Sequence, residues 1–498
     1  MSNFNEMPDQ ELWDLTSDDD DRIKADAYYS LGQRFFDRKR YGDAVGPITA
    51  SKDLYKKVDD GKSEGLASFT SALILGSLDR HEEAVEYFTS AIDLYKEHGT
   101  EEMVADAVRG RADALVKIDR DSEARDDYRG ASNYYLAASK KTLAGICLLE
   151  LGDNLGACGF QAEALAVFEE SLALFQSNGD FVGSGRSHDR LAAALIDLGE
   201  METAIGHLEE ALTIFEYIND DYRFAYAQYR LGWTLVSNGE SERALEMLKA
   251  ASASYKRQSK FVDAANADNQ LAHAYAALGY SAEALDLYSR TKTIYEAAGK
   301  VEDALLSDVN SVKLMSPDNL DGQVAIYRRV IQAAKVEELD FIEQACKSRL
   351  AELLCKYDTA EQYEAALELV NDVPEGYWGD NRHEHAKLVT TKAQALVELN
   401  RDSEAEALLL EIISHGFASG YAKEMGEAHF LLGIVAAGRK EKGKADDYVA
   451  KAVALCLASG DVVRAKELSE ILLPDASGST NQILQSEPAS VADIEEQQ

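Results

Sequence analysis

The sequence contains little cysteine and little proline, and it has no long apolar run. Its five cysteines, without a CxxC pair, indicate neither a disulfide framework nor a thiolate zinc site. Such cysteine usage suits a reducing cytosol. No apolar run approaches the length of a membrane span, and we expect no signal peptide because the first residues are acidic. We therefore expect a cytoplasmic protein.

Basic residues are also scarce. The 498 residues include 51 Lys and Arg but 89 Asp and Glu, which gives a formal net charge of -38. Such a surface repels phosphate backbones and anionic lipids, so neither nucleic acid nor a membrane is expected as the main partner. Basic or amphipathic protein segments would fit this charge. Alternatively, the carboxylates only keep a long helical surface soluble.

Sequence patterns typical of catalysis or metal binding are missing. Neither GxxxxGK[ST] nor GxGxxG stands at a strand-to-helix junction. His383 and His385 would point about 200° apart on a helix, so we interpret them as part of a solvated turn. The acidic run 18–21 lacks the glycine and distal glutamate of an EF-hand loop. We expect no catalytic residue, no metal and no cofactor, and hence no enzyme.

Alanine, in contrast, returns every forty residues. After the seventh alanine one residue is inserted, and the series then continues. The positions are Ala44, Ala84, Ala124, Ala164, Ala204, Ala244 and Ala284, followed by Ala325, Ala365, Ala405 and Ala445. A fixed period of this size indicates one supersecondary unit that is copied and stacked.

Other columns accompany this alanine. Small residues stand twelve positions before it and seven after it, and large apolar residues stand nine before and four after. Eleven positions after it the residue is always aromatic in the first seven repeats: Tyr55, Tyr95, Tyr135, Phe175, Phe215, Tyr255 and Tyr295. The offsets fall on two helical stripes, so each repeat is predicted to be two antiparallel helices, A then B. We interpret the aromatic column as core and not as a ligand site.

Glycines mark the turns between these helices. They occur in LGE at 198–200, NGE at 238–240 and LGY at 278–280 after helix A, where glycine can take the left-handed conformation. A second set is expected to close helix B: Gly99, Gly179, Gly299, Gly420 and Gly460.

These columns resemble the tetratricopeptide repeat (TPR). The match is best in LGWTLVSNGESERALEMLKAASASY, 231–255, and in LAHAYAALGYSAEALDLYSRTKTIY, 271–295, and it extends over 24–473. The period is forty instead of about thirty-four, and the usual proline after helix B is missing. The long period is similar to that of kinesin light chains and of bacterial regulatory and peptide-sensing repeat proteins. HEAT-type repeats, with periods near forty, remain an alternative.

We therefore predict an all-α, right-handed α-solenoid superhelix of about eleven TPR-like helical hairpins plus a C-terminal capping helix. The expected parts are an acidic, disordered segment over 1–22, a regular array over 23–300 and a divergent array over 301–460. A capping helix over 461–474 and a disordered tail over 475–498 follow. Leu12, Trp13 and Leu15 could dock as a short amphipathic turn.

The resemblance implies that helix A lines a concave groove, at offsets -18, -15 and -11 from the alanine. The groove residues that these offsets select are Arg186, Asp189, Tyr226, Tyr229, Trp233, Asn266, Asn269, His273 and Asn310. Asparagine can hold a peptide backbone, and Tyr and Trp supply rigid contact area. The alternative is a merely wet wall with Tyr229 and Trp233 packed on a neighbouring helix.

We expect a non-catalytic scaffold or adaptor that binds a protein or peptide segment in this groove. Two alternatives remain: a peptide-responsive regulator that switches a partner when the superhelix tightens, and an accessory subunit of an enzyme complex. The partner and the oligomeric state do not follow from the sequence.

Overall fold

The computed structural model describes residues 4, 7–374, 377, 382–414 and 422–472. Within these residues the chain is helical and has no strand. It divides into two compact units, 1–280 and 281–498. This boundary falls ahead of the one expected at 300, between the helix that ends at Ala277 and the helix that begins at Ser281. The expected all-α repeat fold is confirmed.

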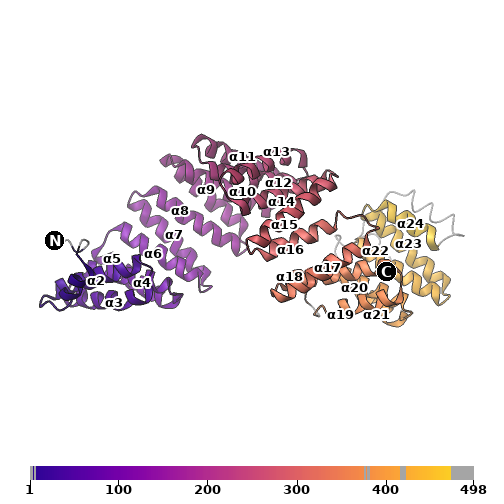
Figure 1. Cartoon of the computed structure of the whole chain (residues 1–498), viewed down its shortest axis with the longest axis horizontal. Helices are drawn as coiled ribbons and strands as arrows, with labels where there is room; N and C mark the ends of the chain where they lie inside the picture. The colour runs from indigo at the N-terminus through magenta and orange to yellow at the C-terminus, as the bar shows by residue number, and fades with distance from the viewer. Residues whose placement is uncertain (1–3, 5–6, 375–376, 378–381, 415–421, 473–498) are drawn as a thin grey trace. The chain divides into compact units, whose positions relative to one another are not determined.

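The first unit is a run of antiparallel helices (Figure 1). The helices are α1 (Asp9–Leu15), α2 (Asp21–Asp37), α3 (Tyr41–Lys57), α4 (Gly61–Gly76), α5 (His81–His98), α6 (Glu101–Val116), α7 (Asp121–Ala137), α8 (Lys141–Ala157), α9 (Gln161–Asn178), α10 (Phe181–Asp197), α11 (Met201–Tyr217), α12 (Asp221–Ser237), α13 (Ser241–Arg257) and α14 (Phe261–Ala277). From α2 on, even numbers are A helices and odd numbers are B helices. Each helix packs mainly on the one before and the one after it.

The second unit continues the alternation less regularly. Its helices are α15 (Ser281–Ala297), α16 (Val301–Val312), α17 (Leu320–Val336), α18 (Asp340–Leu354), the short 3-10 helix η1 (Cys355–Tyr357), α19 (Ala360–Asn371), α20 (Arg382–Glu398), α21 (Asp402–Ser414), α22 (Ala422–Gly438), α23 (Lys442–Ala458) and α24 (Val462–Leu472). Helix α24 packs on α23 and buries Ala465 and Leu468, at the place where a capping helix is expected.

The predicted core columns lie inside. The seven alanines from Ala44 to Ala284 are fully buried, and the aromatic residues from Tyr55 to Tyr295 are at most 4% exposed. Two of these tyrosines also bind the A helix of their own repeat: the Tyr55 hydroxyl donates to Asp26, at 2.8 Å, and Tyr135 donates to Asp106. The aromatic column is therefore core, as expected.

The turns repeat every twenty residues. From Lys39 to Gly299, each turn except the one at Gly99 contains one residue with positive φ, and several of these residues are not glycine. The residues are Lys39, Asp59, Asp79, Asp119, Ser139, Gly159, Gly179, Gly199, Asn219, Gly239, Ser259, Gly279 and Gly299. The left-handed conformation expected at Gly199, Gly239 and Gly279 is confirmed. The second set of glycines closes the B helices as expected at Gly99, Gly179, Gly299 and Gly460. Three of these four glycines are also left-handed, whereas Gly99 has a φ of -103° and Thr100 caps the next helix from an extended conformation. Gly420 lies outside the described residues.

The alanine series loses its register in the second unit. Ala325 is exposed, and the buried residues of α17 are Val324, Tyr327, Val330 and Ala334. Tyr327, Val330 and Ala334 fit the offsets 4, 7 and 11, which makes Gln323 the ladder position and leaves the buried Val324 beside it. The single insertion before Ala325 was thus a wrong interpretation, because α17 begins one residue early and Ala325 is an unrelated surface alanine. Ala405 and Ala445 are buried as expected.

Two further expectations need correction. The segment 1–22 contains α1, whose Leu12 is fully buried, while Trp13 is 42% exposed and meets the edge of Tyr28. Disorder is thus a wrong interpretation for α1, which docks on α2 through Leu12. His383 and His385 belong to α20 and not to a turn, and His385 is exposed. The tail 475–498 lies outside the described residues.

Candidate functional site

The candidate site is a row of side chains on the A helices α8, α10, α12 and α14 of the first unit. We call it the helix-A face, and it consists of Glu150, Asp153, Arg186, Asp189, Arg190, Tyr226, Tyr229, Arg230, Trp233, Asn266, Asn269 and His273. Successive A helices start forty residues apart, so equivalent positions on them fall beside each other. The face therefore follows directly from the repeat.

Charged side chains connect consecutive helices along this face. Arg109 of α6 binds Glu150 of α8 through two hydrogen bonds of 2.5 and 2.9 Å. Arg190 of α10 then contacts Asp153 of α8, with 2.8 Å between Nε and Oδ1. Burial raises the pKa of both Glu150 and Asp153, although the arginines act in the opposite direction. These partly buried ion pairs fix the spacing of α6, α8 and α10.

The series of ion pairs between A helices continues to α12 through Asp189, which is 7% exposed. Arg190 donates to its Oδ2 at 3.1 Å, whereas its Oδ1 lies 3.5 Å from Nε of Arg230. Neither that Oδ1 nor that Nε has a hydrogen-bond partner within the described residues. Buried polar groups are normally satisfied, so this incompletely paired carboxylate and guanidinium are an exception on the face.

Aromatic side chains continue the face on α12. The rings of Tyr226 and Tyr229 are 6.5 Å apart, and the guanidinium of Arg230 lies 5.9 Å from the ring of Trp233. All three aromatic residues are partly exposed. They are therefore neither core residues nor free surface residues: Tyr229 packs against the core cluster around Tyr255, and Trp233 lies beside Arg230.

The other predicted groove residues fall into three groups. Arg186 is exposed on α10, and its charge lowers the pKa of Glu150 and Asp153. Asn266, Asn269 and His273 are partly exposed on α14. Asn310 belongs to α16 in the second unit. Because α16 begins forty residues after α14, the equivalent of Asn269 is Val309 and not Asn310. The first unit thus carries eight of the nine predicted residues.

Sequence reasoning missed three charged residues of the face: Glu150, Arg190 and Arg230. They stand at offset -14, directly beside the -15 column that was selected. A usable signal was present, because opposite charges recur forty-one residues apart in Arg109 with Glu150 and in Asp189 with Arg230.

Outside the helix-A face, the buried cysteines and the possible metal ligands were the other groups to consider. Burial raises the pKa of Cys147, Cys346 and Cys355 to about 12, so these thiols stay protonated at neutral pH. The searched, described residues contain no group of three or more His, Cys, Asp or Glu placed to hold a metal ion. In the same residues, no helix is both long and apolar enough to cross a membrane.

Similar folds occur among solved structures. The quorum sensor NprR from B. thuringiensis is 15% identical over 65% of this chain and 91% of its own, with a TM-score of 0.45. Aspartyl phosphate phosphatase F from Bacillus subtilis is 14% identical over 58% and 76%, with a TM-score of 0.41. A putative kinesin light chain from Podosopora anserina is 16% identical over 40% and 97%, with a TM-score of 0.34. At such TM-scores these structures say nothing of what this chain binds.

Family models give a more direct result, whereas the curated proteins contain no match. Three models described as tetratricopeptide repeat match residues 67–98, 184–257 and 229–305. Two of them cover helices α10 to α15 and thus most of the helix-A face. Together with the helical hairpins and their buried columns, these matches show that the chain contains tetratricopeptide repeats.

Proposed function

We propose that this protein is a non-catalytic scaffold or adaptor that binds a protein or peptide segment on its helix-A face. The observation that carries the proposal is the incompletely paired Asp189–Arg230 contact beside the partly exposed aromatic rings of α12. A bound backbone or polar side chain would complete the hydrogen bonds of the pair, while Trp233 and Tyr229 would supply apolar contact area.

The charge of the face supports a segment of mixed character. Carboxylates of Glu150, Asp153 and Asp189 alternate along it with Arg186, Arg190 and Arg230. A partner with an amide or a hydroxyl near Asp189 and an apolar side chain over Trp233 would match this order. The ion pairs already hold the helices in place, so the face is largely preformed, which lowers the entropic cost of binding.

A peptide-display selection tests this proposal without knowledge of the natural partner. Peptides would be selected on the full chain and then measured against the triple variant Tyr229→Ala, Trp233→Ala and Asn269→Ala. Truncation of aromatic anchors costs about 2 kcal/mol or more, so we expect affinities to fall roughly thirty-fold. The matched control is Tyr217→Ala with Phe261→Ala, two exposed aromatic residues outside the face, which should leave affinities unchanged.

Circular dichroism would show first that both variants keep their helicity. If the selected peptides bind the triple variant as tightly as the wild type, or if the control variant loses binding equally, the helix-A face is not the binding surface. A selection that yields no peptide above background would also contradict the proposal.

A further inference from the structure

The second unit contains a cavity at the place where the repeat is interrupted. Helix α16 has 12 residues, whereas α14, the A helix before it, has 17. It ends at Val312, and α17 begins only at Leu320. The residues that would continue the A helix therefore form a turn, which leaves open a space between α16, α17 and α18. We call it the α16–α18 cavity.

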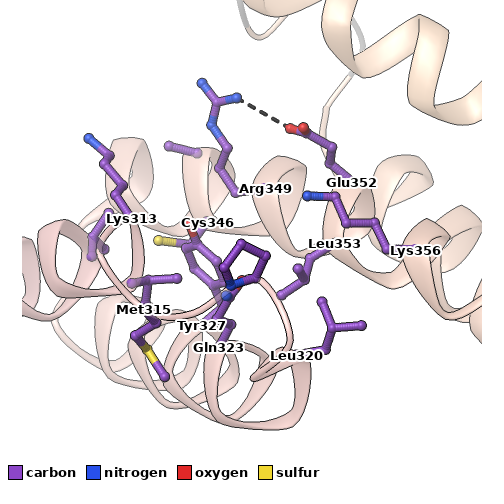
Figure 2. A pocket seen from close by; sticks show the side chains of 14 residues that line it. Lys313, Met315, Leu320, Gln323, Tyr327, Cys346, Arg349, Glu352, Leu353 and Lys356 are labelled. Atoms are coloured by element: carbon purple, nitrogen blue, oxygen red, sulfur yellow. Dashed lines mark hydrogen bonds and ion pairs between the residues drawn. The ribbon is translucent and has the colours of Figure 1, made fainter. Parts of the chain in front are cut away.

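The cavity has a volume of about 490 Å³, and its wall contains both apolar and charged side chains. Val312, Tyr327, Cys346 and Leu353 are buried in this wall, and Met315 and Leu320 close it at the turn. Figure 2 shows Tyr327 and Cys346 at its centre. Because the pKa of Cys346 is raised to about 12, its sulfur acts as apolar lining and not as a thiolate.

Three cations belong to this wall: Lys313, Arg349 and Lys356 (Figure 2). Arg349 is already engaged by carboxylates, at 3.4 Å from Glu352 and 2.9 Å from Glu384. Lys313 and Lys356, in contrast, are exposed and form no ion pair with any described residue. In a chain of net charge -38, these two lysines place positive charge beside the cavity, and the Nζ of Lys313 also lies 3.4 Å from Oδ1 of Asn310.

Gln323 adds a polar group to the same wall. It occupies the ladder position that alanine holds in the first unit, and its Nε2 donates to the carbonyl of Ser316 at 3.0 Å. Its Oε1 accepts no hydrogen bond from the described residues. In the first unit the equivalent position is packed against helix A, so a polar side chain fits here only because α16 ends early.

We propose that the α16–α18 cavity binds a small organic anion with an apolar body, of the medium-chain carboxylate class. At ~30 Å³ for each water-sized group, the cavity accommodates roughly ten to fifteen heavy atoms. Its volume also lies within the range of ordinary small-molecule sites, about 300–1,000 Å³. The apolar chain would contact Tyr327, Cys346 and Leu353, and the headgroup would pair with Lys313 or Lys356, which lie on opposite sides of the cavity (Figure 2). A phosphate monoester on the same chain shares this chemistry.

Calorimetric titration of the full chain tests the proposal with decanoate, decyl phosphate and decanol. The decisive variant is Lys313→Gln with Lys356→Gln, which removes two exposed charges without touching the core. Charge-assisted hydrogen bonds are strong, so we expect this variant to bind decanoate about ten-fold more weakly than the wild type does. The matched control, Lys442→Gln with Lys466→Gln, changes the net charge equally on exposed residues that do not line the cavity.

Further measurements distinguish the contribution of the headgroup from that of the apolar chain. Decanol should bind more weakly than decanoate, and its affinity should not respond to the lysine substitutions. The substitution Ala345→Leu places a larger side chain in the cavity, so it should weaken the binding of all three ligands. Tighter binding of decyl phosphate with the same dependence on the lysines would support the proposal and identify phosphate as the headgroup.

Several results would overturn it. These are the absence of decanoate binding to the wild type at millimolar concentration, unchanged binding to the Lys313/Lys356 variant, and equal loss in the control variant. Acetate or inorganic phosphate that binds as well as decanoate would do the same, because the apolar wall would then contribute nothing. The test concerns only the second unit, so its outcome is independent of the peptide-binding proposal.

Discussion

At the scale of single residues, packing explains two of the glycines inside the helices, Gly152 and Gly232. Gly152 of α8 faces the ring of Phe168 in α9, and Gly232 of α12 faces Leu248 in α13 in the same way. In each pair the glycine is twelve residues before the ladder alanine and the large side chain four after it. The close approach of helices A and B at this point therefore requires a small residue, which is glycine in these two repeats and alanine in others, such as Ala72 opposite Phe88.

The substitution Gly152→Ala tests this packing. A Cβ at this position would overlap the buried ring of Phe168, and overpacking of a core costs about 1–3 kcal/mol. The higher helix propensity of alanine, worth up to about 1 kcal/mol, offsets only part of that cost. We expect a lower midpoint in thermal and urea unfolding.

The matched control is Gly206→Ala in α11, where an added Cβ meets no atom within 4 Å. There only the propensity acts, so the variant should be more stable than the wild type. A loss of stability in both variants, or in neither, would contradict the packing argument.

At the scale of helices, specific polar pairs connect neighbouring helices. The Nδ1 atoms of His188 in α10 and His207 in α11 lie 2.9 Å apart, so one ring donates and the other accepts. Burial lowers the pKa of both histidines, and the charge of His207 lowers that of His188 further, whereas Glu169 and Glu210 act in the opposite direction. The contact thus requires that at least one ring stays neutral.

This pair predicts a pH dependence with a definite sign. Below about pH 6.5 the histidines of the unfolded chain take up protons, but the folded pair does so only at lower pH. The unfolded state then binds more protons, so stability falls as the pH decreases from 7.5 to 5.5. In His207→Gln this fall should be smaller, as measured by thermal unfolding across the range.

His98→Gln serves as its control, because it removes an exposed histidine outside the pair. A pH profile of His207→Gln that is parallel to the wild type would show that the pair does not contribute. A profile of His98→Gln that flattens as much would show that the effect is not specific to the α10–α11 contact.

The sequence allowed the buried stripes of the first unit to be predicted, because helical periodicity and small-to-large complementarity act within one repeat. The same reasoning failed at Ala325, since alanine is common on helix surfaces and only the packing shows that Tyr327, Val330 and Ala334 form the stripe. Turn residues were predicted only where they are glycine. Asp, Asn, Ser and Lys occupy the same left-handed position elsewhere, because Asp and Asn in particular tolerate it.

Part of the candidate site was also predictable from the repeat, because equivalent positions recur at fixed offsets. The offsets located Asp189, Tyr229 and Trp233, but not the partners Arg190 and Arg230, because long side chains reach across to the next helix from a neighbouring offset. The α16–α18 cavity was not foreseen, since it results from an early helix end whose only sequence signal is the turn that contains Pro317.

At the scale of the whole molecule, the dominant feature is the excess of negative charge. The 89 acidic side chains exceed the 51 basic ones, and many of the basic ones are already engaged in ion pairs, as are Arg109 and Arg190. Remaining carboxylates repel one another along the repeat surface, which destabilises a compact state. Screening shortens the reach of this repulsion from about 30 Å at 0.01 M salt to about 10 Å at 0.1 M.

We therefore expect the unfolding temperature to rise as NaCl increases from 0.01 to 0.2 M. Exposed ion pairs weaken over the same range, but each contributes only about 0–1 kcal/mol. Potassium chloride is the control, since screening depends on ionic strength and not on the cation. A constant or falling unfolding temperature, or a rise with only one of the two salts, would contradict this explanation.

The restriction of packing to consecutive helices has a consequence for synthesis on the ribosome. A hairpin of forty residues needs no contact with distant parts of the chain, so it can fold when it emerges. At roughly 5–20 residues per second, the next hairpin follows after about 2–8 s, far longer than the microseconds in which helices form. Each finished repeat can thus present its uncovered apolar face as a template to the repeat that emerges next, and the first unit would be assembled in the order in which it is translated.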